Sequence, residues 1–252
     1  MGAGNLAWHL GHHLVKAGIQ VVQVYNRTPE PGELLAAELN SSFTDRLDCL
    51  TENADLYILA VSDDAICRVL DNGWFNRGHL VVHTSGSVAM DVFAGKAINY
   101  GILYPLQTFT KGKAVDFSQI PLFVEANNVE NLNRIEHFAM KLSGSVYEVD
   151  SEKRMYLHLA AVIASNFSNH LFALTEKLMH EQNLSFDFLK PLIHETVAKA
   201  MVMSPLKAQT GPAIRGNTAV IEKHLALLEH HPEIRELYRV ITESIITIAD
   251  LH

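Results

Sequence analysis

Cysteine, clustered basic residues and long apolar runs are all scarce in this chain. Among 252 residues the only cysteines are Cys49 and Cys67, and they fit neither a disulfide framework nor a zinc site. The net charge is −8 without a cluster of lysine or arginine, which argues against a nucleic-acid or anionic-membrane partner. No stretch approaches the roughly 20 apolar residues of a membrane span, and no charged-then-apolar leader is present. We therefore expect a cytoplasmic protein without a metal site.

What the chain does have is apolar residues, 48% of the total, enough for one large or two modest domains. A glycine-rich turn, Met1-Gly2-Ala3-Gly4-Asn5-Leu6-Ala7, stands at its start. In a dinucleotide-binding turn the first glycine allows a tight bend, the second lets pyrophosphate approach the backbone, and a small third residue packs helix on sheet. We expect this turn to contact a dinucleotide through Gly2, Gly4, Asn5 and Leu6.

A buried strand normally precedes such a turn, and the sequence contains none before Gly2. That strand would lie at the centre of the sheet, between the strand that ends at Tyr25 and the one that ends at Val61. We therefore expect Met1 to occupy the last position of this strand and the natural protein to begin earlier. Cofactor binding would then be weak, because the pyrophosphate turn lacks its anchoring strand.

Helix and strand patterns alternate after the turn. A helix from about Leu6 to Lys16 ends at Ala17-Gly18, a C-cap signal. Strands are predicted at 19–25, 54–61, 80–83, 101–105, 121–126 and 145–149, with helices at 32–40, from 65, near 90 and at 129–142. This order predicts an α/β domain over residues 1–150 with a mostly parallel sheet. Because ligands bind beyond the carboxyl ends of such strands, the loops after Val24, Val61 and His83 should line one crevice.

The strand that ends at Tyr25 is followed by Asn26-Arg27-Thr28, where NAD-preferring folds carry an acidic residue for the ribose hydroxyls. A guanidinium at this point suits the additional phosphate of NADP, because it binds phosphate in bidentate fashion and stacks on adenine. The alternative is a solvated arginine in a turn. We expect NADP as the cofactor, held additionally by Asn26, Arg27, Thr28, Val61, Ser62 and Thr84.

Beyond Asp150 the sequence predicts helices alone. No proline or glycine occurs between residue 151 and Pro191, which leaves room for one long helix over 151–182. Further helices are predicted at 186–203, 218–230 and 232–250, the last beginning with Pro232 and Glu233. Residues 151–252 thus form a predicted all-helical domain.

Several segments resemble the superfamily of pyrroline-5-carboxylate reductase, prephenate dehydrogenase and 6-phosphogluconate dehydrogenase: the glycine turn, Asn26-Arg27-Thr28, 54–63 and the long helix. Residues 104–109, 157–166 and 209–216 resemble a subfamily of NADP oxidoreductases that carries a domain of unknown function. The resemblance implies a Rossmann domain followed by a helical domain for substrate binding and dimerisation. It names no substrate.

The long helix offers candidates for the chemistry. At roughly 100° per residue, Ser165 and Asn169 fall within about 20° of His158. Ser165 is about 10 Å from His158 along the axis, which suits bracketing a ligand. His158 is a candidate general acid, since imidazole exchanges protons near neutral pH. The alternative is that these polar side chains are satisfied by the backbone or by neighbouring helices; the resemblance favours function and adds Asn166.

Two loops complete the predicted site. Ser85, in the loop after His83, is expected near the nicotinamide, and a simple turn is the alternative. Arg215 is the best single clamp for a substrate carboxylate, with an interdomain salt bridge as the alternative. These residues suit hydride transfer to or from a small carbonyl or imine acid. His9 and His13 lack a third ligand and are expected on a solvated face.

The sequence also departs from the superfamily pattern. Hydroxyacid dehydrogenases of this kind carry a lysine four residues before the helix asparagine; if that asparagine is Asn166, the lysine position is Val162. The His-Pro pair of prephenate dehydrogenase is replaced by Tyr104-Pro105, whose phenol is a far weaker acid. The alternative function is therefore a non-catalytic dinucleotide-binding or sensor protein that keeps the fold.

Overall fold

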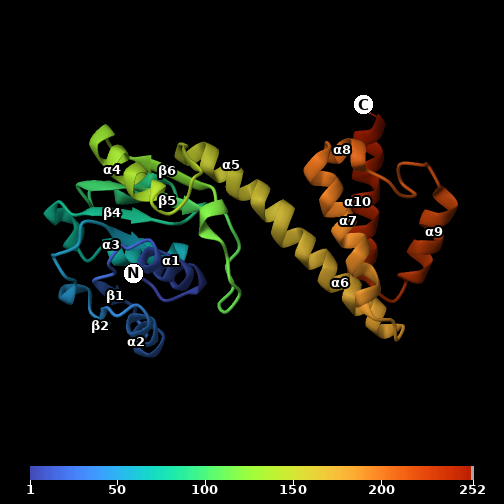
Figure 1. Ribbon diagram of the computed structural model, residues 1–252. Coiled ribbons are helices and arrows are strands. Elements are labelled where there is room, and N and C mark those ends of the chain that lie inside the picture. The colour runs from blue at the N-terminus through green and yellow to red at the C-terminus, as the bar shows by residue number, and fades with distance from the viewer. Residues whose placement is uncertain (251–252) are drawn as a thin grey trace. The chain divides into compact units, whose positions relative to one another are not determined.

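The computed structural model describes residues 1–250 and divides into two compact units, Met1–Ala164 and Ser165–His252 (Figure 1). The first unit contains two sheets. One pairs β1 (Gln23–Tyr25) with β2 (Ser42–Thr44); the other has the order β3 (Tyr57–Leu59), β4 (Leu80–His83), β5 (Asn99–Pro105), β6 (Leu122–Ala126) and β7 (Val146–Glu148). All neighbouring pairs are parallel except β5 and β6. The predicted mostly parallel, Rossmann-like domain is confirmed.

Met1 and Gly2 lie between the two sheets and hydrogen-bond to both. The Met1 nitrogen donates to the carbonyl of Ile58 at 2.6 Å, and the Ala60 N–H donates to the Met1 carbonyl at 2.8 Å. On the other side the Gly2 N–H donates to the Tyr25 carbonyl at 2.7 Å. Met1 and Gly2 thus occupy the predicted position between β1 and β3.

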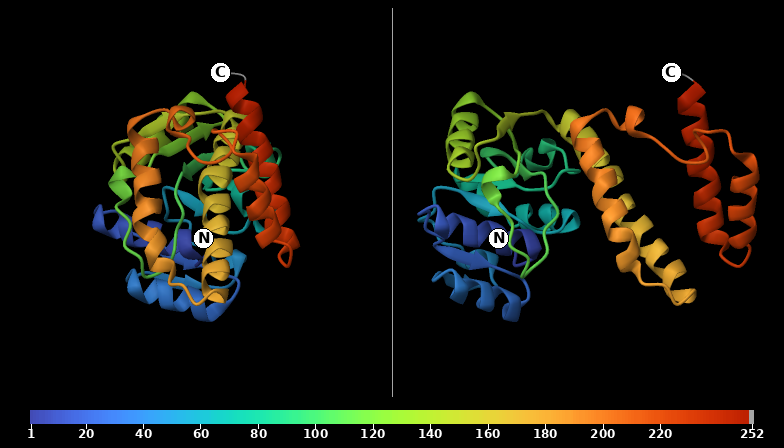
Figure 2. Two further views of the ribbon diagram at one scale, coloured as in Figure 1. Left: turned by 90° about the vertical axis from the view of Figure 1, so that its right-hand side faces the viewer. Right: turned by 45° about the vertical axis from the view of Figure 1, so that its right-hand side comes forward.

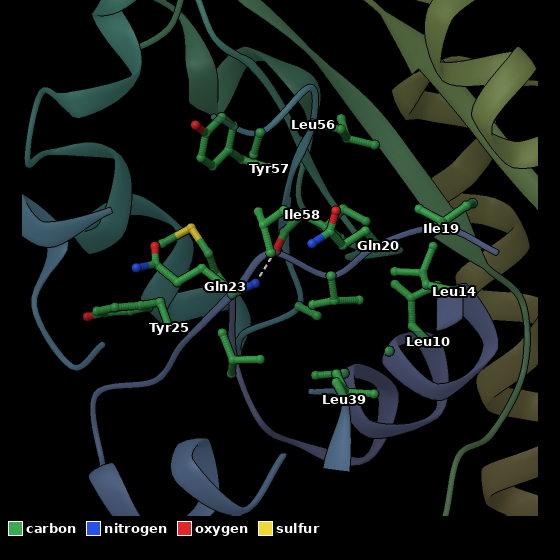
Figure 3. A pocket seen from close by; sticks show the side chains of 18 of the residues that line it. Leu10, Leu14, Ile19, Gln20, Gln23, Tyr25, Leu39, Leu56, Tyr57 and Ile58 are labelled. Atoms are coloured by element: carbon green, nitrogen blue, oxygen red, sulfur yellow. Dashed lines mark hydrogen bonds between the residues drawn. The ribbon is translucent and has the colours of Figure 1, made fainter. Parts of the chain in front are cut away.

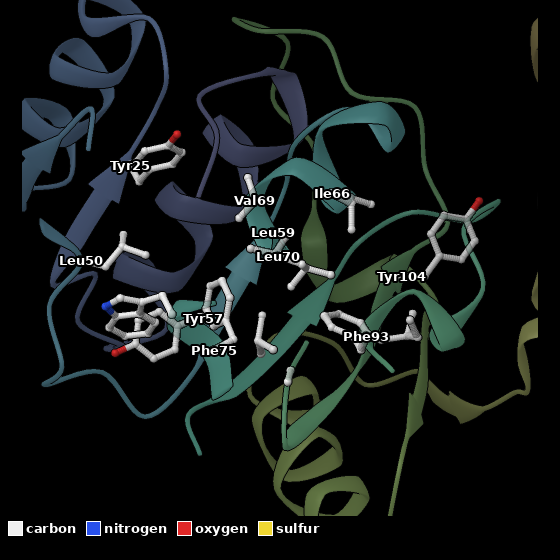
Figure 4. Close-up of a cluster of buried hydrophobic side chains, with 14 of the residues drawn as sticks. Tyr25, Leu50, Tyr57, Leu59, Ile66, Val69, Leu70, Phe75, Phe93 and Tyr104 are labelled. Carbon is white, nitrogen blue, oxygen red and sulfur yellow. The ribbon is translucent and has the colours of Figure 1, made fainter. Parts of the chain in front are cut away.

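Both faces of the larger sheet are buried, as the continuous apolar runs predict. On β4, Val81 belongs to the apolar cluster on one face and Val82 to the cluster on the other. The first cluster, drawn in Figure 4, joins the sheet to α3 (Asp63–Leu70) and to Phe75 and Phe93. The second cluster joins it to α1 (Asn5–Lys16) and α4 (Val129–Met140).

Several strands are shorter than predicted. The run 19–25 pairs only from Gln23, and 54–61 only over Tyr57–Leu59. Each of these strands has a partner along one side only, apart from the contacts with Met1 and Gly2, so the rest of each run is extended without a ladder. The sequence pattern missed β2, which is three residues long, and placed α2 (Pro29–Glu38) three residues late.

One nearly continuous helical segment leaves the first unit. It consists of α5 (Ser151–Ala161), a π-helix (Val162–Phe167) and α6 (Ser168–Glu181), which matches the predicted helix over 151–182. By length and composition alone Ser151–Glu181 could cross a membrane, a test that core helices of soluble proteins also pass. Its most apolar 18-residue window has a mean hydropathy of 1.2, and no residue of that window is buried. The sequence predicted no membrane span because it has no long uninterrupted apolar run, whereas an averaged hydropathy tolerates interspersed polar residues.

The second unit is helical, as predicted. After a short 3₁₀ turn (Phe186–Leu189), α7 (Lys190–Val202) runs beside α6, which both views of Figure 2 show. The unit continues with α8 (Pro205–Ala208), α9 (Thr218–Leu227) and α10 (Pro232–Asp250). Asn217 caps α9, its side chain accepting from the Val220 N–H.

Candidate functional site

The glycine turn has the geometry of an anion site. Gly2 has φ +99°, and a Cβ there would lie 2.2 Å from the carbonyl oxygen of Ala60, so only glycine fits. A Cβ on Gly4 would meet no atom within 4 Å, which leaves open space in front of α1. No side chain caps the first turn of α1, so its backbone N–H groups are free for an anion. These features fit the pyrophosphate of a dinucleotide.

A pocket of about 360 Å³ opens beside this turn, at the carboxyl ends of β1 and β3. Most of the predicted cofactor residues line it: Gly2, Gly4, Asn26, Arg27, Thr28, Val61 and Ser62. Of the other three, Asn5 and Leu6 begin α1 behind the turn. Thr84 is buried, and its hydroxyl donates to the Leu59 carbonyl at 3.3 Å.

Two arginines line this pocket. Arg27 comes from the loop after β1 and Arg68 from the last turn of α3; both are exposed. No carboxylate is among the lining residues, so the local field favours a phosphate. Sequence reasoning missed Arg68. The sequence did hold a signal for Arg68. It lies three residues after Ala65 on the helix that follows β3, and residues i and i+3 share a helix face.

The loop after β4 is held by its own serines. The Ser85 hydroxyl accepts from the N–H groups of Ser87 and Val88, both at 3.1 Å. The Ser87 hydroxyl donates to Asp63. Ser85 therefore stabilises this turn, which is the alternative to a place beside the nicotinamide. Its hydroxyl can contact a substrate only if these hydrogen bonds rearrange.

The structure brings together two residues that the sequence separates by 54 positions. The Tyr104 hydroxyl on β5 lies 3.2 Å from the His158 Nδ1 on α5, and the rings meet edge to face. Tyr104 is buried, and burial raises the pKa of its phenol, an effect that the nearby Arg154 charge partly offsets. A neutral phenol donates to an unprotonated Nδ1 and accepts from an Nδ1–H, so the tautomer of His158 sets the direction of this bond. The tyrosine that replaces the expected histidine is thus the partner of His158.

Gly86 makes room for this pair. A Cβ on Gly86 would lie 2.7 Å from both the His158 Nδ1 and the Tyr104 Cζ. Real Cβ atoms essentially never come within 3.0 Å of another atom, so only glycine permits both rings to sit against the loop after β4. No sequence pattern signalled this role for Gly86, since it depends on contacts with two distant elements.

A buried ion pair fixes the start of α5. Arg154 is 1% exposed, and its guanidinium donates to Glu125 on β6 and to the Val88 carbonyl at 2.6 Å. It also donates to the Ser151 hydroxyl at 3.1 Å. Residues four apart share a helix face, so this anchor lies one turn before His158 and sets its position. The sequence showed Arg154 only as part of a polar helix start.

His83, at the end of β4, is fully buried. Its Nδ1 accepts from the Ser85 N–H at 3.2 Å, which places the ring proton on Nε2, and its ring stacks on Phe93. Burial, helped by the charge of Arg154, lowers the pKa of His83 to about 4. His83 is therefore neutral at physiological pH and supports the loop that carries Ser85.

The remaining predicted site residues belong to the second unit. Ser165, Asn166, Asn169 and Arg215 are all exposed there. Ser165 and Asn166 lie in the π-helix, whose wider turn changes the angle between successive residues. The prediction that Ser165 and Asn169 share the face of His158 assumed α-helical spacing throughout, so the π-helix invalidates that angle. Such π segments occur frequently at functional sites.

His9 and His13 do not lie on a solvated face, and that expectation is wrong for His9 in particular. His9 is buried, with Nε2 2.8 Å from the Thr110 carbonyl. His13 Nε2 lies 3.0 Å from the Leu142 carbonyl and its ring stacks on Phe117. Both histidines tie α1 to loops that pack over it. Within residues 1–250, no group of three histidine, cysteine, aspartate or glutamate side chains is placed to hold a metal ion.

Comparisons with known proteins agree with this geometry. Residues 1–86 match the family "NADP oxidoreductase coenzyme F420-dependent", and 120–245 match "Domain of unknown function (DUF2520)". No curated protein matches the chain. A Bacteroides fragilis protein assigned as an NADP oxidoreductase is 42% identical, with a TM-score of 0.91 over 98% of this chain and 96% of its own.

Two more distant structures share the fold. An imine reductase from Myxococcus stipitatus in complex with NADP⁺ has a TM-score of 0.68 at 17% identity, over 99% of this chain and 91% of its own. A reductive aminase from Aspergillus terreus in complex with NADPH has a TM-score of 0.75 at 14% identity, over 98% and 92%. The chain therefore belongs to the family of NADP oxidoreductases that joins a Rossmann-like domain to this helical domain of unknown function.

Proposed function

We propose that this NADP oxidoreductase transfers hydride to or from a small carbonyl or imine acid, and that His158 and Tyr104 handle the proton. The observation that carries the proposal is the 3.2 Å contact between the Tyr104 hydroxyl and His158 Nδ1. A reaction of this class moves a proton to or from the substrate oxygen or nitrogen as the hydride moves. A histidine paired with a buried phenol is suited to that exchange.

The cofactor supplies the hydride, and the chain's residues hold it. The free N–H groups at the start of α1, with the open space in front of Gly4, suit the pyrophosphate. Arg27, after β1, and Arg68, in the last turn of α3, both line the pocket and suit the additional phosphate of NADP. Val61 and Ser62 complete this wall, and Asn5, Leu6 and Thr84 support it from behind.

Tyr104 and His158 divide the proton work. In the acid direction the protonated imidazole donates from Nδ1 to the Tyr104 hydroxyl oxygen and gives its Nε2 proton to the substrate. The neutral imidazole that remains keeps the Nδ1–H bond to Tyr104, and its free Nε2 takes a proton from the substrate in the reverse direction. Tyr104 fixes the tautomer and orientation of the ring and is a positioning residue. Arg154 holds the first turn of the same helix in place.

We propose that the second unit supplies substrate contacts and the subunit interface. Ser165, Asn166 and Asn169 offer hydrogen bonds, and Arg215 offers a clamp for a carboxylate. Ser85 is kept as a residue that orients substrate once its turn rearranges. These roles are the reason for the proposed domain boundary at residue 150, with a substrate and dimerisation domain over 151–252.

A homodimer is supported by the apolar surface of the second unit. Large apolar side chains are exposed on its helices: Leu171, Leu192, Val197, Met201, Val202 and Leu227. A cavity of about 640 Å³ between α6 and α7 adds Phe172 and Ile193 to this surface. Exposed apolar area of this extent marks a protein or membrane contact. We propose that this surface contacts a second copy of the chain, as in helical domains of the 6-phosphogluconate dehydrogenase type. We also propose that the protein is cytoplasmic.

The test is oxidation of NADPH against a panel of 2-keto acids and cyclic imines. We expect His158→Ala to lower kcat by about 10²-fold or more, the usual contribution of a general acid, and Tyr104→Phe to lower it by about tenfold. Neither should change the Kd of NADPH more than about twofold. Tight NADPH binding with no oxidation of any substrate would contradict the reductase and favour a dinucleotide-binding protein without turnover.

Cofactor choice is tested separately with Arg27→Ala and Arg68→Ala. Each should raise the Kd of NADPH by about 10- to 100-fold, the worth of one charge-assisted phosphate contact, and raise the Kd of NADH far less. Arg46→Ala is the matched control, because that arginine pairs with Asp48 outside the pocket. Unchanged NADPH binding in both variants would show that the extra phosphate binds elsewhere.

A further inference from the structure

The loop after β4 is held from two sides, and one of them is the start of α5. The loop carries Gly86, which lies against the paired tyrosine and histidine rings. Arg154 donates to the Val88 carbonyl at 2.6 Å, and the Ser151 hydroxyl accepts from the Met90 N–H at 2.9 Å. These contacts fix the end of the loop to the same helix that carries the histidine.

The other side of the loop is held by Asp63, the first residue of α3. The Ser87 hydroxyl donates to the Asp63 carboxylate, and an ionised carboxylate can only accept. Asp63 directly follows Ser62, which lines the cofactor pocket, whereas Asp63 itself is not a lining residue. Asp63 therefore connects the loop after β3, which borders the cofactor pocket, with the loop after β4.

The direction of each hydrogen bond in this chain follows from the donors available. A serine hydroxyl has one proton and two acceptor positions. The Ser87 proton goes to Asp63, so Ser85 donates and Ser87 accepts in the 3.1 Å contact between the two serine hydroxyls. The Ser85 oxygen also accepts from the Ser87 and Val88 N–H groups, which uses all of its capacity. Asp63 thus sets the orientation of both hydroxyls, and with them the turn around Gly86.

Asp63 follows a strand that is hydrogen-bonded along both edges. On one edge of β3 the Met1 nitrogen donates to the Ile58 carbonyl at 2.6 Å, a hydrogen bond that Figure 3 shows beside a cavity of about 440 Å³. On the other edge the Thr84 N–H and hydroxyl both donate to the Leu59 carbonyl at 3.3 Å. Because β3 is held on both edges, the carboxylate four residues after Leu59 gives the loop a fixed point of attachment.

We infer that Asp63 is a positioning residue for the hydride transfer proposed above, because it holds the loop that places Gly86 against Tyr104 and His158; this role rests on the proposed function of that pair. The fit is close, since a Cβ on Gly86 would lie 2.7 Å from atoms of both rings. A loop released at Ser87 no longer keeps this fit. Displacement of a reacting group by about 1 Å lowers rates by up to about 10²-fold, so loss of the hydrogen bond should be visible in kcat.

The first test compares Asp63→Ala with Asp63→Asn. We expect Asp63→Ala to lower kcat for NADPH oxidation about tenfold and to change the Kd of NADPH little, because Asp63 does not line the cofactor pocket. Asp63→Asn keeps an oxygen that accepts from Ser87 and should stay within about threefold of the parent. A parent-level kcat in Asp63→Ala, or an equal loss in both variants, would overturn the inference.

Asp64→Ala is the matched control. Asp64 is also exposed and also lies in the first turn of α3, so its removal takes the same charge from the start of the helix and leaves the contact with Ser87 in place. This variant should keep the parent's kcat. A loss equal to that of Asp63→Ala would mean that charge near the helix start is responsible, and would contradict the role of the hydrogen bond.

Ser87→Ala removes the other partner of the hydrogen bond. It should lower kcat about as much as Asp63→Ala does, and the double variant should lose no more than either single one, since both substitutions remove the same contact. Additive losses would show that Asp63 acts through a different contact and would overturn the inference.

Two measurements by NMR do not depend on turnover. Asp63→Ala should speed amide hydrogen exchange about tenfold at Ser87 and Val88, whose N–H groups donate within the turn, and should shift the imidazole signals of His158. Asp64→Ala should change neither. Parent-like exchange at both amides, or unchanged His158 signals in Asp63→Ala, would overturn the inference. Absence of hydride transfer to every substrate would contradict the proposed function and leave these two results intact.

Discussion

Gly86→Ala perturbs the Tyr104–His158 pair without removing either residue. The added Cβ would lie 2.7 Å from His158 Nδ1 and from Tyr104 Cζ, whereas ordinary van der Waals contact begins at 3.4 Å. The difference, 3.4 − 2.7, requires each ring to move by about 0.7 Å. Gly86 does not have a positive φ, so alanine introduces no backbone strain and the effect is steric alone.

The size of the effect follows from the contact distance. If His158 retreats by 0.7 Å, the 3.2 Å separation from the Tyr104 hydroxyl grows to about 3.9 Å, which is no longer a hydrogen bond. Overpacking of this kind costs about 1–3 kcal/mol of the free energy of unfolding. Displacement of a reacting group by about 1 Å costs up to about 10²-fold in rate. We therefore expect kcat to fall by roughly 10- to 100-fold.

The assay measures kcat for NADPH oxidation together with urea unfolding. Gly144→Ala is the control, because a Cβ there meets nothing within 4 Å, and it should match the parent in both measurements. Combining Gly86→Ala with Tyr104→Phe should cost less than the sum of the two, since both remove one hydrogen bond. Parent-level kcat in Gly86→Ala, or full additivity of the two substitutions, would refute the role of the pair.

Two further predictions concern stability. His83 is neutral when folded because its pKa falls from 6.5 to about 4, so the unfolded chain binds more protons between these values and the free energy of unfolding should fall by about 2 kcal/mol from pH 7.5 to pH 5. Urea titrations of His83→Asn, which keeps an acceptor for Ser85, should lack this part of the slope, and an unchanged slope would exclude His83 as its source. Arg154→Met should cost about 3–5 kcal/mol because it leaves Glu125 partly buried without its partner. Adding Glu125→Leu should recover much of this loss in urea unfolding; no recovery would mean that Arg154 acts through packing alone.

The sequence was most informative where a local pattern decides the structure. Continuous apolar runs predicted the buried strands, and Gly2 and Gly4 predicted a turn whose geometry the structure confirms. Arg27 was singled out because its position at a strand's carboxyl end is a local property, and it lines the pocket beside the turn. Met1 lies between β1 and β3, as the alternation of strands and helices predicted.

Long-range contacts were beyond the sequence. Tyr104 was interpreted as a departure from a family pattern, because nothing local shows that a residue 54 positions away supplies the histidine. The ion pair between Arg154 and Glu125 likewise joins a helix start to a strand. The π-helix at Val162–Phe167 could not be predicted, because the periodicity of side chains does not show which backbone carbonyl accepts from each N–H.

Because β1–β2 and β3–β7 form two separate sheets, a bound cofactor would connect them. The proposed pocket takes Asn26 and Arg27 from one side of the division and Val61 and Ser62 from the other, so a bound dinucleotide spans both halves. By linkage, a ligand at about 100 times its Kd adds about 2.7 kcal/mol to the folded state. By the same linkage, a substitution that weakens the packing of the two halves should lower the affinity for the cofactor. The affinity for the cofactor and the stability of the first unit are thus coupled, and a change in one changes the other.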